Sequence, residues 1–109
     1  MPLVTVSMTP PKNSESVILM IDRIRVRGAD AFECGPENIW VIYQPLNQGW
    51  SSAPGPIVTI DALEGRSPDM KRNLVAVVVE SVGAVLSSPS EKVWVHYREM
   101  KKEDVWFDR

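Results

Sequence analysis

The chain has 109 residues, with 12 Lys and Arg against 14 Asp and Glu, and a formal net charge of −2 at pH 7. This length predicts a single domain over 1–109, and the near-balanced charge argues against a nucleic-acid or membrane partner, because both need clustered basic charge. A single cysteine excludes an intrachain disulfide and a zinc site built from several cysteines. No stretch has the length of a membrane span or the pattern of a signal peptide, so we expect a cytoplasmic protein without metal or other cofactor.

The first half of the chain predicts a strand, a helix and a second strand. The segment "PLVTVSM" at 2–8 is rich in β-branched residues, as buried strands are. Asn13 and Ser14 can cap a helix that "CGP" at 34–36 ends, and 38–44 alternates as a strand does. The helix has apolar residues at helical spacing: Val17, Ile18, Ile21 and Ile24.

The second half repeats this order of elements. "PIVTIDAL" at 56–63 predicts a strand, Ser67 and Pro68 suit the start of a helix, and 92–98 alternates as a second strand. The inner stripe of the helix comprises Leu74, Val77, Val78, Ser81, Val82 and Val85. The last strand turns Val93, Val95 and Tyr97 to one face and Trp94, His96 and Arg98 to the other.

An offset of 54 positions relates the two halves. It aligns "ENIWVIYQPL" at 37–46 with "EKVWVHYREM" at 91–100 without a gap. It also pairs Pro2 with Pro56, Thr5 with Thr59, Trp40 with Trp94, and Tyr43 with Tyr97. We interpret the chain as two fused copies of one unit, 2–50 and 56–109, joined by a linker at 51–55.

These elements predict an α+β fold. A helix that connects two pairing strands makes each unit a βαβ crossover with parallel strands. Two fused βαβ units then give a four-stranded mixed sheet with both helices on one face. The other face stays uncovered, and in so small a chain we expect self-association to cover it.

The segment "PIVTIDALEGRSPDMKRNL" at 56–74 resembles the start of 4-oxalocrotonate tautomerase, whose short subunit opens with proline, a strand, "LEGRS" and a helix. The resemblance continues through "VWV" at 93–95 and "EM" at 99–100. "WVHYREM" at 94–100 is similar to cis-3-chloroacrylic acid dehalogenase, a fused member of the same tautomerase superfamily. Fused members assemble as trimers, so the resemblance implies the tautomerase fold, a homotrimer and a small carboxylate substrate.

Pro2 is the candidate catalytic residue, because the superfamily uses an amino-terminal proline. Removal of Met1 would leave Pro2 as a secondary amine, and an apolar pocket with nearby cations would lower the pKa of that amine toward neutrality. The amine could then accept and return a proton near pH 7. Pro56 begins the equivalent strand, but its nitrogen lies in a peptide bond and has no basic lone pair.

The resemblance also implies which residues bind the substrate. Arg66, in "LEGRS", matches the arginine that holds a substrate carboxylate, a role that suits a planar guanidinium. Lys12 occupies the equivalent place in the first copy, where it is either a weaker anion ligand or a surface lysine. Trp50 and Trp106 fall close to the aromatic wall of the family's pocket, which excludes water.

Two departures from the family pattern leave the reaction open. Trp40 and Trp94 replace the second arginine; they either pack between protomers or, in a substrate-binding role, donate an indole hydrogen bond. One arginine of the dehalogenase falls on Leu63, and its water-activating carboxylate falls on Phe107. The leading hypothesis is an isomerase that tautomerises a small 2-oxo or enol acid. The alternatives are a hydratase, dehalogenase or decarboxylase with Pro2 as the acid, and a non-catalytic relative.

Overall fold

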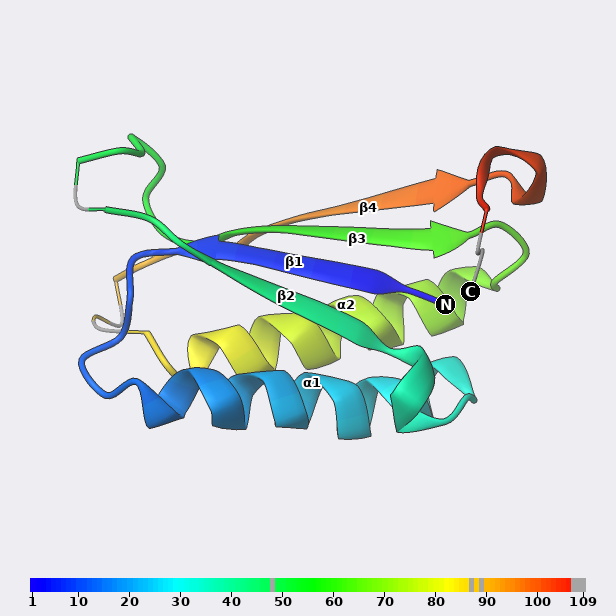
Figure 1. Ribbon diagram of the computed structural model, residues 1–109, viewed down its shortest axis with the longest axis horizontal. Helices are drawn as coiled ribbons and strands as arrows, with labels where there is room; N and C mark the ends of the chain where they lie inside the picture. Colours follow the sequence, from blue (N-terminus) through cyan, green and yellow to red (C-terminus); the bar gives the residue numbers. More distant parts are fainter. Residues whose placement is uncertain (48, 87, 89, 107–109) are drawn as a thin grey trace.

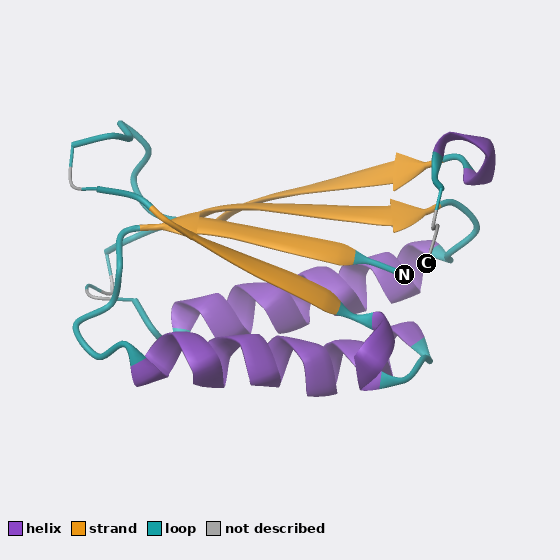
Figure 2. Ribbon diagram, viewed as in Figure 1, coloured by secondary structure: helices purple, strands orange, loops and turns teal. Residues whose placement is uncertain are grey.

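The computed structural model describes residues 1–47, 49–86, 88 and 90–106, which form a four-stranded sheet and two long helices (Figure 2). In chain order the elements are β1 (Leu3–Met8), α1 (Glu15–Phe32), η1 (Pro36–Asn38), β2 (Trp40–Pro45), β3 (Ile57–Leu63), α2 (Pro68–Gly83), β4 (Trp94–Met100) and η2 (Lys102–Asp104), where η marks a short 3₁₀ helix. Within this described part of the chain, no helix has the length and apolar character that a membrane crossing requires.

The strands lie in the order β2-β1-β3-β4, with the outer pairs parallel and the central β1–β3 pair antiparallel. Both helices lie on one face of the sheet and pack against each other (Figure 1). The predicted α+β fold, a four-stranded mixed sheet with two helices on one face, is confirmed. Strands β2 and β4 begin two residues later than predicted. Before β2, the Ile39 N–H bonds the Pro36 carbonyl in η1, and before β4, the Lys92 N–H bonds the Pro54 carbonyl, which precedes β3.

The core fills the space between the sheet and the helices. Every second side chain of β1 and β3 points toward the helices, and Val4, Val6, Val58 and Ile60 have no exposed surface. The helices contribute their own buried side chains: Met20, Ile24, Phe32, Leu74, Val78 and Val82. Each such side chain stabilises the fold by roughly 1.5–3 kcal/mol relative to an exposed one. This packing fixes the ends of β1 and β3 relative to each other.

The starts of both helices follow from local sequence. Ser67 Oγ accepts a hydrogen bond from the Met70 N–H at 3.2 Å, which confirms the predicted cap of α2. At the start of α1, Asn13 Oδ1 accepts a hydrogen bond from the Glu15 N–H at 2.9 Å, whereas the Ser14 side chain makes no capping bond. Of the two predicted capping residues, Asn13 therefore does the capping.

The buried stripe of α1 differs from the predicted one. Ile18 belongs to the predicted stripe, but it is 68% exposed, so that assignment is wrong. The buried residues recur at four-residue intervals instead: Met20, Ile24, Gly28 and Phe32. The cause is the contact with α2, because a Cβ atom at Gly28 would lie 3.2 Å from Leu74 Cδ1. This close approach sets the rotation of α1 about its own axis.

The face of the sheet opposite the helices carries large apolar side chains, and we call it the open face. It includes Trp40 and Ile42 on β2, Ile57 on β3 and Trp94 on β4, all of them exposed. Both described helices lie on the other side of the sheet (Figure 1). Exposed large apolar side chains on one face of a sheet are a feature of interaction surfaces.

Candidate active site

The antiparallel pairing of β1 with β3 gives the sheet two chemically different ends. We call the end with the start of β1 and the ends of β3 and β4 the Pro2 end, and the opposite one the Pro56 end (Figure 1). The predicted site residues divide between them: Pro2, Arg66 and Trp106 at the Pro2 end, and Lys12, Trp50 and Trp94 at the Pro56 end. Within one chain, the structure therefore brings only half of the predicted set together.

A cavity of about 370 Å³ lies at the Pro2 end on the open face, and we call it the N-terminal pocket. Its apolar lining comes from all four strands and the segment after η2: Leu3, Trp40, Leu63, Met100, Val105 and Trp106. Met1 also lines the pocket, and its carbonyl carbon is bonded to the Pro2 nitrogen. The Pro2 nitrogen is therefore one bond away from a residue that lines the pocket, while Pro2 itself is fully buried and is not among the lining residues.

Asp61 and Lys102 are the charged residues that line the N-terminal pocket. Arg98 holds the Asp61 carboxylate with two hydrogen bonds, from Nε to Oδ1 at 2.7 Å and from Nη2 to Oδ2 at 3.0 Å. The hydrogen bond and charge of Asp61 raise the pKa of Arg98. Lys102 makes no ion pair with any residue that the structure describes. Arg98 neutralises the charge of Asp61, so among the described side chains of the lining Lys102 is left as a cation without an ion-pair partner.

The matching position at the Pro56 end is neutral. There Ser7 Oγ donates a hydrogen bond to Gln44 Oε1 at 2.9 Å. Ser7 precedes Asp61 by 54 positions, and Gln44 precedes Arg98 by the same number, so both pairs occupy the same register in their strand pairs. The ion pair thus lies at the end of the sheet where Pro2 is found.

Arg66 lies at the Pro2 end, but its guanidinium contacts the end of α1. Its Nη1 donates a hydrogen bond to the Phe32 carbonyl oxygen at 3.3 Å, and its Cζ lies 4.8 Å from the centre of the Phe32 ring. The carbonyl groups in the last turn of a helix lack intrahelical partners, so a cation is stabilising there. In this arrangement Arg66 is not among the residues that line the N-terminal pocket.

A second cluster of charges lies at the Pro2 end on the helix side of the sheet. Tyr97 is central to it: its hydroxyl is buried and has no hydrogen-bond partner in the described part of the chain. Burial and the charge of Glu99 raise the pKa of Tyr97, and the charge of Arg66 opposes this shift. Lys71 pairs with Glu99 at 2.6 Å and lies 5.6 Å from the centre of the Tyr97 ring. Lys71 is therefore neutralised by a carboxylate.

Sequence reasoning missed Asp61 and Lys102 as pocket residues. The alternation of β3 was a usable signal, because it turns Asp61 to the same face as Leu63. For Lys102 the sequence contains no such signal, because the position of this residue depends on how the chain turns after β4. Over the described residues, no group of three or more His, Cys, Asp or Glu side chains is arranged to hold a metal ion.

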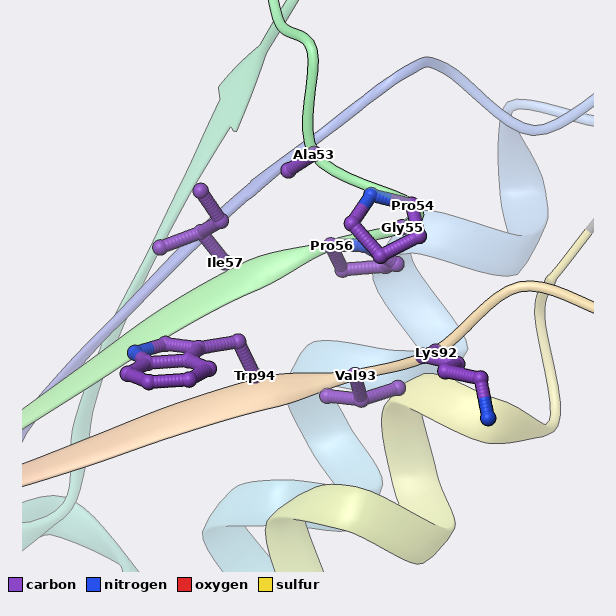
Figure 3. Close-up of a pocket in the computed structure, with 8 residues that line it drawn as sticks. All are labelled: Ala53, Pro54, Gly55, Pro56, Ile57, Lys92, Val93 and Trp94. Carbon is purple, nitrogen blue, oxygen red and sulfur yellow. The ribbon is translucent and has the colours of Figure 1, made fainter.

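A second cavity, of about 470 Å³, lies at the Pro56 end, and we call it the Pro56 pocket (Figure 3). Trp94 and Ile57 lie on one side of it, and the Lys92 side chain points away from Trp94 (Figure 3). A Cβ atom on Gly55 would lie only 2.1 Å from the Lys92 carbonyl oxygen, so the linker needs glycine there. Because the Pro56 nitrogen is part of the peptide bond with Gly55, it cannot act as a base.

Lys12 and Trp50 do not line the N-terminal pocket either. Lys12 lines a separate hollow of about 270 Å³ between the start of α1 and the segment after α2. Trp50 lies in the loop between β2 and β3 and is mostly exposed. Trp106 lines the N-terminal pocket as its outer wall, with 83% of its surface exposed.

The fold is that of a chain in which two βαβ units share one sheet, and the N-terminal pocket lies at one end of that sheet. A family model described as "Tautomerase enzyme" matches residues 56–108. A probable tautomerase of Listeria monocytogenes is 49% identical over 49 residues, which are 45% of this chain and 80% of the relative. The chain therefore belongs to the tautomerase family.

Solved structures show that the likeness extends over both units. A wild-type fused 4-OT asymmetric trimer superposes with a TM-score of 0.82 at 18% identity, over 96% of this chain and 91% of that one. A member of the cis-3-chloroacrylic acid dehalogenase family gives a TM-score of 0.77 at 21% identity, over 96% and 79% of the two chains. At these identities the likeness shows the fold alone.

Proposed function

We propose that the chain is an isomerase that moves a proton within a small 2-oxo or enol carboxylic acid, with the amine of Pro2 as base and acid. The observation that carries this proposal is the position of Met1, which lines the N-terminal pocket and is bonded to the Pro2 nitrogen. Removal of Met1 would expose a secondary amine to a cavity that has apolar walls and a cation. Family membership and the name of the Listeria relative support the reaction class.

In the proposed reaction, the neutral Pro2 amine takes a proton from the carbon next to the substrate's carbonyl group, or from its enol hydroxyl. The protonated amine then returns that proton to the other position, so no atom is gained or lost. The apolar side chains around the pocket and the charge of Lys102 disfavour the protonated amine, which lowers its pKa. A base of this kind contributes about 10²- to 10⁴-fold to the rate.

The test compares two preparations of the same chain. One begins at Pro2, as verified by intact mass, and the other carries a short extension that keeps the Pro2 nitrogen in a peptide bond. We expect the first to convert enol to keto forms of a 2-oxo acid, followed by ultraviolet absorbance, and the second to be inactive. The same extension at the carboxyl terminus is the control. Equal turnover by both preparations would exclude Pro2 as the catalyst.

We further propose that the chain forms a homotrimer through the open face. The exposed apolar side chains of β2, β3 and β4 support this assembly, as does the trimeric state named for the fused 4-OT structure. Lys12, Trp50 and Trp94 lie at the Pro56 end, so a contribution from them to substrate binding at Pro2 would have to come from a neighbouring copy. A monomer in sedimentation experiments at micromolar concentration would exclude this proposal.

Hydration or dehalogenation with a protonated Pro2 is the second candidate reaction. It is favoured by Asp61, a carboxylate in the pocket that could orient a water molecule, and by the fold shared with the dehalogenase family member. Phe107, which aligns with the water-activating carboxylate of the dehalogenase, lies outside the described residues. Release of halide from 3-haloacrylates by the preparation that begins at Pro2 would favour this reaction over tautomerisation.

A further inference from the structure

Three cations at the Pro2 end, Arg98, Lys71 and Arg66, are already engaged by other groups. Arg98 is held by the Asp61 carboxylate through two hydrogen bonds. Lys71 is paired with Glu99 at 2.6 Å. The third, Arg66, donates to a carbonyl oxygen at the end of α1 and is not part of the pocket lining.

Lys102 differs in position from these three cations. It lines the N-terminal pocket and has no ion-pair partner in the part of the chain that the structure describes. It is the first residue of η2, where the Val105 N–H bonds its carbonyl oxygen at 3.4 Å, so the turn that carries it also places Val105 in the pocket wall. No carboxylate among the described residues neutralises this ammonium group, so it can pair with an anionic ligand.

The rest of the pocket limits what that ligand can be. Asp61 is only 16% exposed at its side chain and is already paired with Arg98, so among the described lining residues Lys102 is left to pair with one carboxylate of a ligand. The remaining walls are apolar, with Leu3, Leu63 and Trp106 from three separate segments of the chain. A volume of about 370 Å³ lies within the usual range for small-molecule sites.

We propose that Lys102 binds the substrate's carboxylate in the N-terminal pocket, and that the pocket selects acids with a single carboxylate and an apolar or aromatic body. This proposal rests on the proposed function, because it assigns the substrate class of the same site. Arg66 then acts chiefly on the end of α1. Lys102 pairs with the single carboxylate of the ligand. Asp61 does not compete for Lys102, because it is already paired with Arg98.

Binding of inert probes tests this proposal separately from catalysis. The protein that begins at Pro2 is titrated in a calorimeter with 3-phenylpropanoate, with phenylsuccinate, which has a second carboxylate, and with the neutral 3-phenylpropanamide. We expect 3-phenylpropanoate to bind most tightly. Lys102→Ala should weaken its binding about 10- to 100-fold, as expected for loss of a hydrogen bond to a charged group, and should leave the amide unchanged. Lys102→Arg should restore most of the affinity.

Lys101→Ala is the matched control, because Lys101 is exposed like its neighbour Lys102 but does not line the pocket. It should change binding less than twofold, and Arg66→Ala should affect 3-phenylpropanoate less than Lys102→Ala does. The proposal is overturned if Lys102→Ala binds the acid as tightly as the unchanged protein, or if phenylsuccinate binds more tightly than 3-phenylpropanoate. A chain that binds the acid through Lys102 but turns over no 2-oxo acid would refute the proposed function and leave this assignment intact.

Discussion

Replacing two glycines by alanine should change stability in opposite directions. At Gly55 the new Cβ atom would lie 2.1 Å from the Lys92 carbonyl oxygen and 2.8 Å from the Lys92 nitrogen. Both are backbone atoms, so a side-chain rotation cannot relieve the overlap. At Gly83, the last residue of α2, the new Cβ atom would meet nothing within 4 Å beyond its chain neighbours and the backbone of its own helix.

The expected size of each effect follows from these distances. Gly55→Ala has to push the linker away from Lys92, just before β4, and this breaks the hydrogen bond from the Lys92 N–H to the Pro54 carbonyl, now 3.1 Å long. Overpacking typically costs about 1–3 kcal/mol, and we expect a loss of stability in that range. Gly83→Ala should stabilise the chain by about 0.4–1 kcal/mol, because it removes freedom from the unfolded state in a helical position.

Urea unfolding followed by circular dichroism measures both changes. Protein concentration has to be held constant, since self-association makes apparent stability depend on it. The slope of free energy against urea should be the same in both variants, so that the midpoints report stability alone. Equal midpoints for the two variants would refute the close approach of the linker to the backbone of Lys92, and with it the shape of the Pro56 pocket.

Three further predictions concern the site and the assembly. Pro2→Ala leaves a primary amine in nearly the same place, so turnover should fall by about 10²- to 10⁴-fold while 3-phenylpropanoate still binds; unchanged turnover would contradict the catalytic role. Burial raises the pKa of Tyr97, so the folded chain should lose stability as the pH rises above about 10, and Tyr97→Phe should reduce that loss in alkaline unfolding. If the unchanged chain and Tyr97→Phe lost the same stability at alkaline pH, the raised pKa of Tyr97 would not be the cause of that loss. Trp94→Glu places a charge on the open face and should shift the sedimentation profile toward monomer, whereas Glu80→Gln on the exposed side of α2 should leave it unchanged.

The parts of the fold that depend on local chemistry could be predicted from the sequence. The cap at Ser67 needs only a hydroxyl three residues before a free N–H group. The alternation of β4 needs only the pleat of a strand. The rotation of α1 was not predictable in this way, because it depends on Gly28 meeting Leu74, a contact between residues far apart in the chain.

The candidate site shows the same limit. Family resemblance selected Pro2 and Arg66, and both lie at one end of the sheet, but resemblance could not show that the Arg66 guanidinium contacts Phe32. Lys102 enters the pocket only because β1 and β3 pair antiparallel and the chain turns back after β4. That arrangement is a property of the folded chain, and no short motif encodes it.

The difference between the Ser7–Gln44 pair and the Asp61–Arg98 pair has a genetic consequence. In an assembly of one-unit chains, a single codon change appears in every copy of the site. Here each unit has its own codons, so a mutation alters one end of the sheet and leaves the other as it was. The chain can therefore vary the charge and shape of its Pro56 end by point mutation without changing the residues around Pro2.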